Sequence, residues 1–262
     1  MKNLILMTNI NNNNNSSCQT LYRYAVKKGM EWSKRINCEF KCITDTNAFP
    51  DYSPTWHRMI MFSDQYKDYD NIVYVDADLV ISKHAPNIFE IMDQYEQEFF
   101  ACSDYPKPLR IQTGYFNAGF IGLKKSLINK CSMNYIIEKM KKYKNKQHYD
   151  YTKTHGNDQC ALNEIVKEKC DSYVQLSKSW NIFPPRDIDN YNPFYGVHYI
   201  HAYKDAWNYK HDVEERLNLI AKCEGKITFH QTILNKIKYF PEYWKNTQQS
   251  ILDLEANGDA NV

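Results

Sequence analysis

Short apolar runs and helix-period stripes alternate along most of the chain. Leu4 to Met7 form an apolar run, and an asparagine-rich polar tract follows it. Ser16 or Ser17 can then cap a helix. The apolar stripe of that helix consists of Leu21, Ala25, Gly29, Trp32 and Ile36. A strand, a loop and a helix in this order predict an α/β unit.

The same alternation continues beyond this first unit. Residues 39–45 read as a second strand and residues 71–81 as a third. Between them, Ser53 and Pro54 are a typical start for a helix, which would carry Trp56, Met59 and Ile60 on one face. Further strands are expected at 98–104 and 115–123, and residues 196–207 read as a last strand and its exit loop. Further helices are expected up to about residue 144 and from about Asn157. The pattern predicts a mixed, mostly parallel sheet with helices on both faces.

Two aspartates interrupt the apolar segment "NIVYVDADLVI" at residues 71–81. In an α/β sheet the ligand crevice lies at the carboxyl ends of the strands, where Asp76 and Asp78 are expected. Two carboxylates at this spacing can hold a hard cation together with diphosphate oxygens. The alternative is a turn aspartate that caps the next helix beside a second, exposed acid.

A phosphatase with Asp76 as the phosphoryl-accepting nucleophile also fits the letters "DADLV". That chemistry needs a further acidic pair after another buried strand. Asp158 follows the polar segment "YDYTKTHGN", which does not read as a strand. The phosphatase alternative therefore lacks its second motif.

Charge, cysteine content and hydropathy narrow the class of protein. With 33 basic and 31 acidic residues, the chain has no overall field that would draw it to nucleic acid or an anionic membrane. The eight cysteines form no CxxC pair, which favours reduced thiols and a cytoplasmic location. No stretch approaches the roughly 18 apolar residues that a membrane span needs. A cytoplasmic protein without a transmembrane segment is expected.

Four sequence blocks in order resemble glycosyltransferase family 8, the glycogenin and lipopolysaccharide galactosyltransferase group with the GT-A fold. The blocks are "YDNIVYVDADLVI" (69–81), "TGYFNAGFIGL" (113–123), "NDQCALNEI" (157–165) and "HYIHAYKDAW" (198–207). The last block departs most from the family pattern H-x-x-G-x-x-K-P-W. His198 and Lys204 keep the spacing, but His201 replaces the glycine and "DAW" replaces "PW". His201 is therefore an alternative to His198 as a metal ligand.

The resemblance implies a role for each matching residue. Asp76, Asp78 and His198 would hold Mn²⁺, or Mg²⁺. Asp76 would also bind the substrate by contacting the ribose of the donor, and Lys204 would meet its diphosphate. The remaining substrate-binding positions would be Thr8, Arg58, Asp104, Asn117, Ala118 and Gly119. Asp158 and Gln159 would lie at the reacting sugar, with Gln159 beside the anomeric carbon.

The resulting expectation is a metal-dependent glycosyltransferase that moves a sugar from a UDP-sugar to a glycan or protein acceptor. The family resemblance implies retention of anomeric configuration, and front-face displacement is favoured because an amide is a poor nucleophile. Two alternatives stay open. One is a nucleotide-sugar-binding protein that has lost turnover, and the other is a nucleotidyltransferase or phosphatase on a similar scaffold.

The expected domain organisation is a catalytic domain over residues 1–207 and a helical extension over residues 208–262. Apolar residues recur in the polar extension at Leu217, Ile220, Ile227, Leu234 and Ile237. This pattern predicts that the extension packs on the domain or mediates a homodimer.

Overall fold

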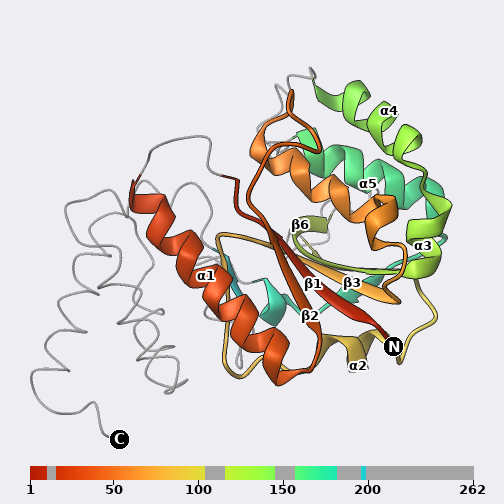
Figure 1. The fold of residues 1–262 in the computed structure, drawn as a ribbon. Helices are drawn as coiled ribbons and strands as arrows, with labels where there is room; N and C mark the ends of the chain where they lie inside the picture. The colour runs from red at the N-terminus through yellow and green to blue at the C-terminus, as the bar shows by residue number, and fades with distance from the viewer. Residues whose placement is uncertain (11–15, 104–115, 145–156, 182–195, 199–262) are drawn as a thin grey trace, which may run out of the picture. The chain divides into compact units, whose positions relative to one another are not determined.

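A computed structural model describes residues 1–10, 16–103, 116–144, 157–181 and 196–198 of the chain (Figure 1). The strands are β1 (Asn3–Thr8), β2 (Glu39–Ile43), β3 (Asn71–Asp76), β4 (Leu79–Ile81), β5 (Phe99–Ser103), β6 (Phe116–Lys124), β7 (Val174–Leu176) and β8 (Gly196–His198). The α-helices are α1 (Ser16–Arg35), α2 (Ile88–Met92), α3 (Lys125–Lys130), α4 (Met133–Lys144) and α5 (Asn157–Lys169), and the 3₁₀ helices are η1 (Pro54–Phe62), η2 (Asp64–Tyr66) and η4 (Lys178–Trp180).

The chain divides into two compact units. Unit 1 consists of Met1–Asn14, Gly29–Asp76 and Pro86–Ser177, and unit 2 of Asn15–Lys28, Ala77–Ala85 and Lys178–Val262. The domain boundary predicted at residue 207 and the extension after it lie outside the described residues. Within the described residues, no helix is both long and apolar enough to span a bilayer.

Unit 1 is built around a six-stranded sheet with the order β2-β1-β3-β6-β5-β7. β1 pairs parallel with β2 and β3, and β5 pairs parallel with β7, whereas β6 runs antiparallel to β3 and β5. Every strand of this sheet except β6 therefore points the same way. This arrangement confirms the predicted mixed, mostly parallel sheet.

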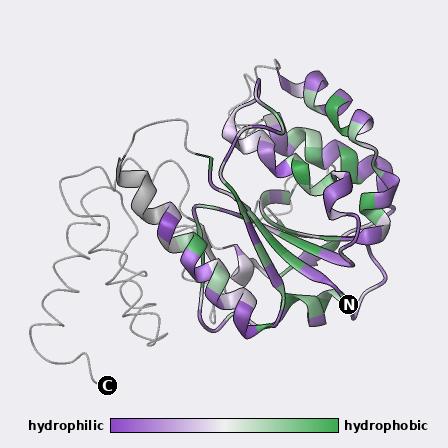
Figure 2. Ribbon diagram, viewed as in Figure 1, coloured by the Kyte–Doolittle hydropathy of each residue, from purple (hydrophilic) through white to green (hydrophobic). Residues whose placement is uncertain are grey.

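Alternation of side chains along the strands gives the sheet two apolar faces. One face contributes Leu4, Leu6, Ile72 and Tyr74 to a core that also contains residues of η1, α3, α4 and α5. The strands of this sheet are largely green in the hydropathy view (Figure 2).

The opposite face of the sheet is covered by α2 and by the part of α1 that belongs to unit 1. A Cβ on Gly29 would come within 3.1 Å of Met7 and 3.0 Å of Phe40, so the glycine lets α1 approach β1 and β2 closely. Trp32 lies 6.2 Å from Phe120, measured between ring centroids. A Cβ on Gly122 would in the same way meet Met92 of α2 at 3.0 Å.

Several local predictions need correction. The segment from Pro54 is a 3₁₀ helix rather than an α-helix, and Ser53 does not cap it through its side chain. Every residue from Trp56 to Phe62 is buried, so packing on all sides outweighs helical periodicity there. The helix predicted up to about residue 144 is divided into α3 and α4. The strand predicted at 71–81 is divided by a turn into β3 and β4, which belong to different sheets. The short strand β7 was not predicted. Of the strand predicted at 196–207, residues after His198 lie outside the described residues.

A polar network joins α4 to α5 on the outer side of the unit. The Lys139 ammonium donates to Glu164 at 2.6 Å and to Glu168 at 2.5 Å, and Lys142 also donates to Glu164 at 2.6 Å. The Tyr143 hydroxyl is a further donor to Glu164. Because α5 begins with Asn157, Asp158 and Gln159, this network fixes the helix that carries two predicted site residues.

Glu164 should make the stability of the protein depend on pH in the acid range. Burial raises the pKa of this carboxyl, but the hydrogen bonds from Lys139, Lys142 and Tyr143 outweigh burial and lower the pKa from 4.5 to about 2. The unfolded state therefore binds the proton first as pH falls, so this stabilisation is present above pH 4.5 and is lost toward pH 2. Glu164→Gln should cost about 2 kcal/mol of unfolding free energy at pH 7 and flatten this acid dependence, as measured by urea unfolding.

Glu138→Gln is the matched control for this prediction, since Glu138 lies exposed on α4. The control should keep the wild-type free energy of unfolding at pH 7. Equal acid sensitivity in wild type and Glu164→Gln would contradict the assignment.

Candidate functional site

Asp76 ends β3 and is held there by a buried tyrosine. Tyr74 lies two residues earlier in the strand, so both side chains project from the same face of the sheet. The Tyr74 hydroxyl donates to Asp76 Oδ1 at 3.0 Å and lies 2.7 Å from Thr8 Oγ1. Thr8 sits directly opposite Asp76 in the β1–β3 register. Burial, reinforced by the Asp76 charge, raises the pKa of Tyr74 well above its usual value, so the hydroxyl keeps its proton.

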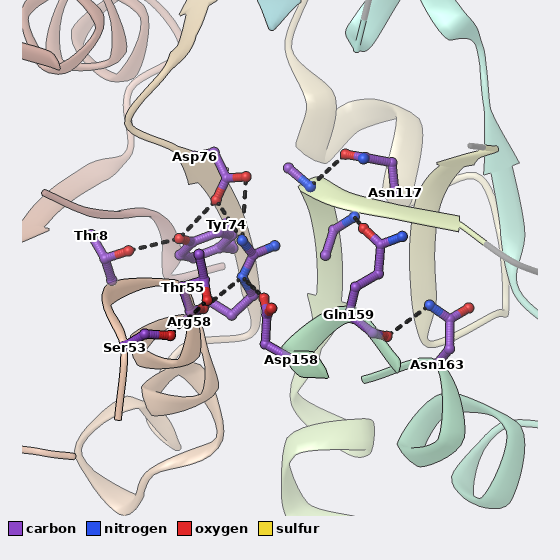
Figure 3. Close-up of polar contacts among 12 residues, drawn as sticks. Thr8, Ser53, Thr55, Arg58, Tyr74, Asp76, Asn117, Asp158, Gln159 and Asn163 are labelled. Carbon is purple, nitrogen blue, oxygen red and sulfur yellow. Dashed lines mark hydrogen bonds and ion pairs between the residues drawn. The ribbon is translucent and has the colours of Figure 1, made fainter. Parts of the chain in front are cut away.

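Arg58 of η1 bridges two carboxylates that are distant in sequence (Figure 3). Its Nη2 lies 3.1 Å from Asp76 Oδ1, and its Nε lies 3.1 Å from Asp158 Oδ2. The exposed fractions of the Arg58, Asp76 and Asp158 side chains are 7%, 16% and 4%. Arg58 Nε also donates to the Thr55 carbonyl at 3.0 Å. The buried Arg58 guanidinium therefore fixes the end of β3 against the start of α5.

Side-chain amides join α5 to the beginning of β6. Gln159 Oε1 accepts from the main-chain N–H of Ala118 at 3.1 Å. Asn163 accepts from the Phe116 N–H at 3.3 Å and donates to the Phe116 carbonyl at 3.4 Å. Asn117 Oδ1 accepts from the Gly119 N–H at 2.8 Å. Because β6 runs antiparallel to β3, its first residues lie at the edge where β3 ends.

Unit 2 contains the second aspartate of the pair. Asp78 lies in the turn before β4 and is partly exposed. β4 pairs antiparallel with β8, and His198 lies opposite Leu79, the residue after Asp78. Among the side chains that the structure describes, no three His, Cys, Asp or Glu groups gather closely enough to hold a metal. The side chain of His198 is not among them.

The donor types at these positions suit a hard divalent cation. Carboxylate oxygens with one imidazole are a donor set that accepts Mn²⁺ and Mg²⁺. The chain keeps Asp76 and Asp78 two positions apart, and the β4–β8 register brings the backbone of His198 next to Asp78. The residues present therefore fit the predicted cation in type.

Several predicted site residues lie together in unit 1. Hydrogen bonds and ion pairs join Thr8, Arg58, Asp76 and Asp158 through Tyr74 and Arg58. Gln159 follows Asp158 and contacts the Asn117–Gly119 segment at Ala118. The predicted residues Asp104, His201 and Lys204 lie outside the described residues.

Two residues of this site were not predicted, namely Tyr74 and Asn163. Tyr74 could have been found because a residue two positions before Asp76 shares its face of the strand. Asn163 could have been found because a residue four positions after Gln159 shares its face of the helix.

Comparisons with known proteins identify the fold. No family model matches the chain, and no curated protein matches it. Among solved structures, a glycosyltransferase involved in the glycosylation of the major capsid of PBCV-1 is similar at a TM-score of 0.57 and 8% identity, covering 84% of this chain and 100% of that one. Such low identity carries information on the fold alone.

The galactosyltransferase LgtC is similar in two structures. Its complex with donor and acceptor sugar analogs gives a TM-score of 0.50 at 14% identity, covering 93% of this chain and 99% of that one. Its active-site mutant, in which a glutamine is replaced by glutamate, gives a TM-score of 0.51 at 12% identity with the same coverage. Together with the sheet order, these likenesses show the GT-A fold of glycosyltransferases.

Proposed function

We propose that the protein is a metal-dependent glycosyltransferase that moves a sugar from a UDP-sugar to a glycan or protein acceptor. The observation that carries the proposal is the Arg58 bridge between Asp76, at the end of β3, and Asp158, at the start of α5. It places carboxylates at the carboxyl edge of the sheet, where α/β folds bind ligands. The GT-A fold favours this function over the phosphatase and nucleotidyltransferase alternatives.

Asp76, Asp78 and His198 are the proposed holders of Mn²⁺ or Mg²⁺. When bound, the cation neutralises negative charge on the diphosphate leaving group. Lys204 is proposed to add a second positive charge at the same phosphates. Arg58 and Tyr74 keep the Asp76 carboxylate in one orientation, because both donate hydrogen bonds to it.

The sugar side of the site is assigned to α5 and β6. Asp158 and Asn117, together with Asp104, are proposed to hydrogen-bond sugar hydroxyls, and Gly119 to let the backbone approach the donor. The carboxylates would stabilise the positive charge that develops on the sugar ring as the bond between the sugar and the diphosphate breaks. Thr8 and Arg58 are proposed to border the nucleotide. Retention through front-face displacement is part of the proposal.

Donor hydrolysis tests this function without knowledge of the acceptor. Incubation with UDP-galactose, UDP-glucose or other UDP-sugars and Mn²⁺ should release UDP slowly from at least one donor, because water replaces the acceptor in an active site of this kind. Chelation of the metal with EDTA should abolish the release. UDP and Mn²⁺ together should also raise the melting temperature.

The same assay separates the alternatives. Binding with no release from any donor would indicate a nucleotide-sugar-binding protein that lacks turnover. Neither binding nor release across the panel would contradict the proposed function. Proton NMR of the first-formed product would show the starting anomer under retention and the opposite anomer under inversion.

A further inference from the structure

The imidazole of His57, in η1, is completely buried. The exposed fraction of the residue is 0%, and neither ring nitrogen has a hydrogen-bond partner among the residues that the structure describes. Buried polar side chains in native proteins are nearly always paired, so an imidazole in this state is unusual. Protonation would increase the mismatch, because an imidazolium carries two N–H donors and a charge that has left water.

Aromatic side chains pack around His57 from the loop that joins β2 to η1, residues 44–53. The Phe49 ring meets the imidazole edge-on, with 5.6 Å between the ring centroids and 65° between the planes. Phe49 in turn contacts Tyr52 at 6.2 Å, and Tyr52 contacts Trp56 at 5.6 Å. These surroundings favour the uncharged ring, and burial lowers the pKa of His57 below its usual 6.5.

Neighbouring charges do not reverse this preference for the neutral ring. The main chain of Tyr52, the Asp45 charge and the main chain of Phe49 raise the pKa of His57, but by less than burial lowers it. Asp45 is exposed and accepts from the Asn47 N–H at 2.9 Å. Other ionisable side chains on elements that pack against η1 have partners of their own, namely Tyr74 with Asp76 of β3, Lys130 of α3 with Glu98, Lys139, Lys142 and Tyr143 of α4 with Glu164, and Lys144 of α4 with the ring of Tyr52.

The loop of residues 44–53 is the part of these surroundings that can open at least cost. Within this range, all of which the structure describes, Phe49 alone is buried. By contrast, β1 and β3, against which η1 also packs, are buried strands of the sheet. Segments with few buried contacts and an exposed backbone open most readily. The loop is therefore the route by which His57 can reach water.

The first turn of η1 connects this loop to the candidate site. The Trp56 N–H donates to the Ser53 carbonyl at 3.0 Å, and Arg58 Nε donates to the Thr55 carbonyl at 3.0 Å. Arg58 follows His57 directly and bridges the carboxylates of β3 and α5. Movement of this turn toward water would therefore pull on the bridge.

We propose that His57 is an acid-sensitive switch whose protonation opens residues 44–53 and the first turn of η1 and so loosens the Arg58 bridge. The open state exposes the imidazole to water and binds the proton first as pH falls. The closed state is therefore fully favoured above about pH 6.5 and is progressively lost below it. This range lies above that of Glu164, whose contribution is lost below pH 4.5. The inference concerns regulation and does not depend on sugar transfer.

Hydrogen exchange of the wild-type protein, followed by NMR, tests the switch directly. After correction for intrinsic exchange rates, protection of the Phe49, Tyr52 and Trp56 amides should fall by about twofold to tenfold between about pH 7.5 and about pH 5.5. Proton uptake by an open state with an ordinary histidine pKa favours opening by at most about tenfold over this range. Amides of α4 should keep their protection. A fall of less than about twofold in the loop, or an equal fall in α4, would overturn the inference.

His57→Phe removes the titrating group and keeps a ring of similar size. Between the same pH values, the melting temperature of wild type should fall by about 1 to 4 °C more than that of this variant. His84→Phe, the same substitution at an exposed position, is the matched control and should keep the wild-type pH dependence. An unchanged pH dependence in His57→Phe would overturn the inference, and so would an equal effect of His84→Phe.

The exchange measurement on wild type decides alone if His57→Phe does not fold. Activity on UDP-sugars enters neither readout, so failure of the proposed function would leave both results valid.

Discussion

Replacing Arg58 with leucine should lower the free energy of unfolding by about 3 kcal/mol. The guanidinium is the shared partner of two carboxylates whose side chains are only 16% and 4% exposed. Removing the guanidinium leaves the Asp76 and Asp158 carboxylates without their shared partner. A buried charge without a partner destabilises the folded state. Urea unfolding measures the change as a lower midpoint with an unchanged slope.

Two further variants test whether the effect of Arg58→Leu comes from the charge bridge. Arg23→Leu, at an exposed position of α1, should change stability by less than about 0.5 kcal/mol. Combining Arg58→Leu with Asp158→Asn removes one of the two stranded charges and should recover about 1 kcal/mol. If the double variant is less stable than Arg58→Leu by the full cost of Asp158→Asn alone, the two residues are not coupled.

This bridge marks the limit of what the sequence could predict about the site. The apolar run before Asp76 placed that residue at a strand end because a strand buried on both faces reads as a continuous apolar segment. Arg58 was predicted only as a neighbour of the nucleotide. Its contact with Asp158 joins residues 100 positions apart, and no local pattern encodes such a contact.

The direction of β6 could not be predicted from periodicity either. An apolar strand has the same pattern whether it runs parallel or antiparallel to its neighbour. The reversal of β6 places Asn117 to Gly119, which follow its first residue, at the edge where β3 ends. Family resemblance selected these residues, but only the sheet topology explains how a strand start can serve a site built from strand ends.

The prediction of an α-helix from Pro54 was wrong because helix type there also depends on tertiary contacts. Ser53 followed by Pro54 is a common start for an α-helix, and the sequence signal there is correct for the position of the element. The continuous burial from Trp56 to Phe62 shows that tertiary packing, and not an amphipathic period, determines the geometry. The 3₁₀ form still directs Arg58 toward Asp76, so the error in helix type does not separate these two residues.

Asp78→Ala should abolish sugar release while leaving the fold intact. Under the proposed function this carboxylate holds the cation that offsets charge on the departing diphosphate, so the rate should fall about 1,000-fold. Asp78 lies in a turn and is partly exposed, so its removal should leave the core of the protein packed. Release of UDP from the UDP-sugar that wild type turns over, followed with Mn²⁺ present, measures the effect.

The melting temperature measures the effect of Asp78→Ala on metal binding without any need for turnover. UDP with Mn²⁺ should raise the melting temperature of wild type more than UDP alone, since a ligand that binds only the native state stabilises it by mass action. In Asp78→Ala the increment due to Mn²⁺ should disappear. Asp51→Ala, at an exposed position, should keep both the activity and the increment. Full activity in Asp78→Ala would contradict the proposed role of Asp78. Removal of a side chain that supplies a metal ligand must lower the affinity for the metal.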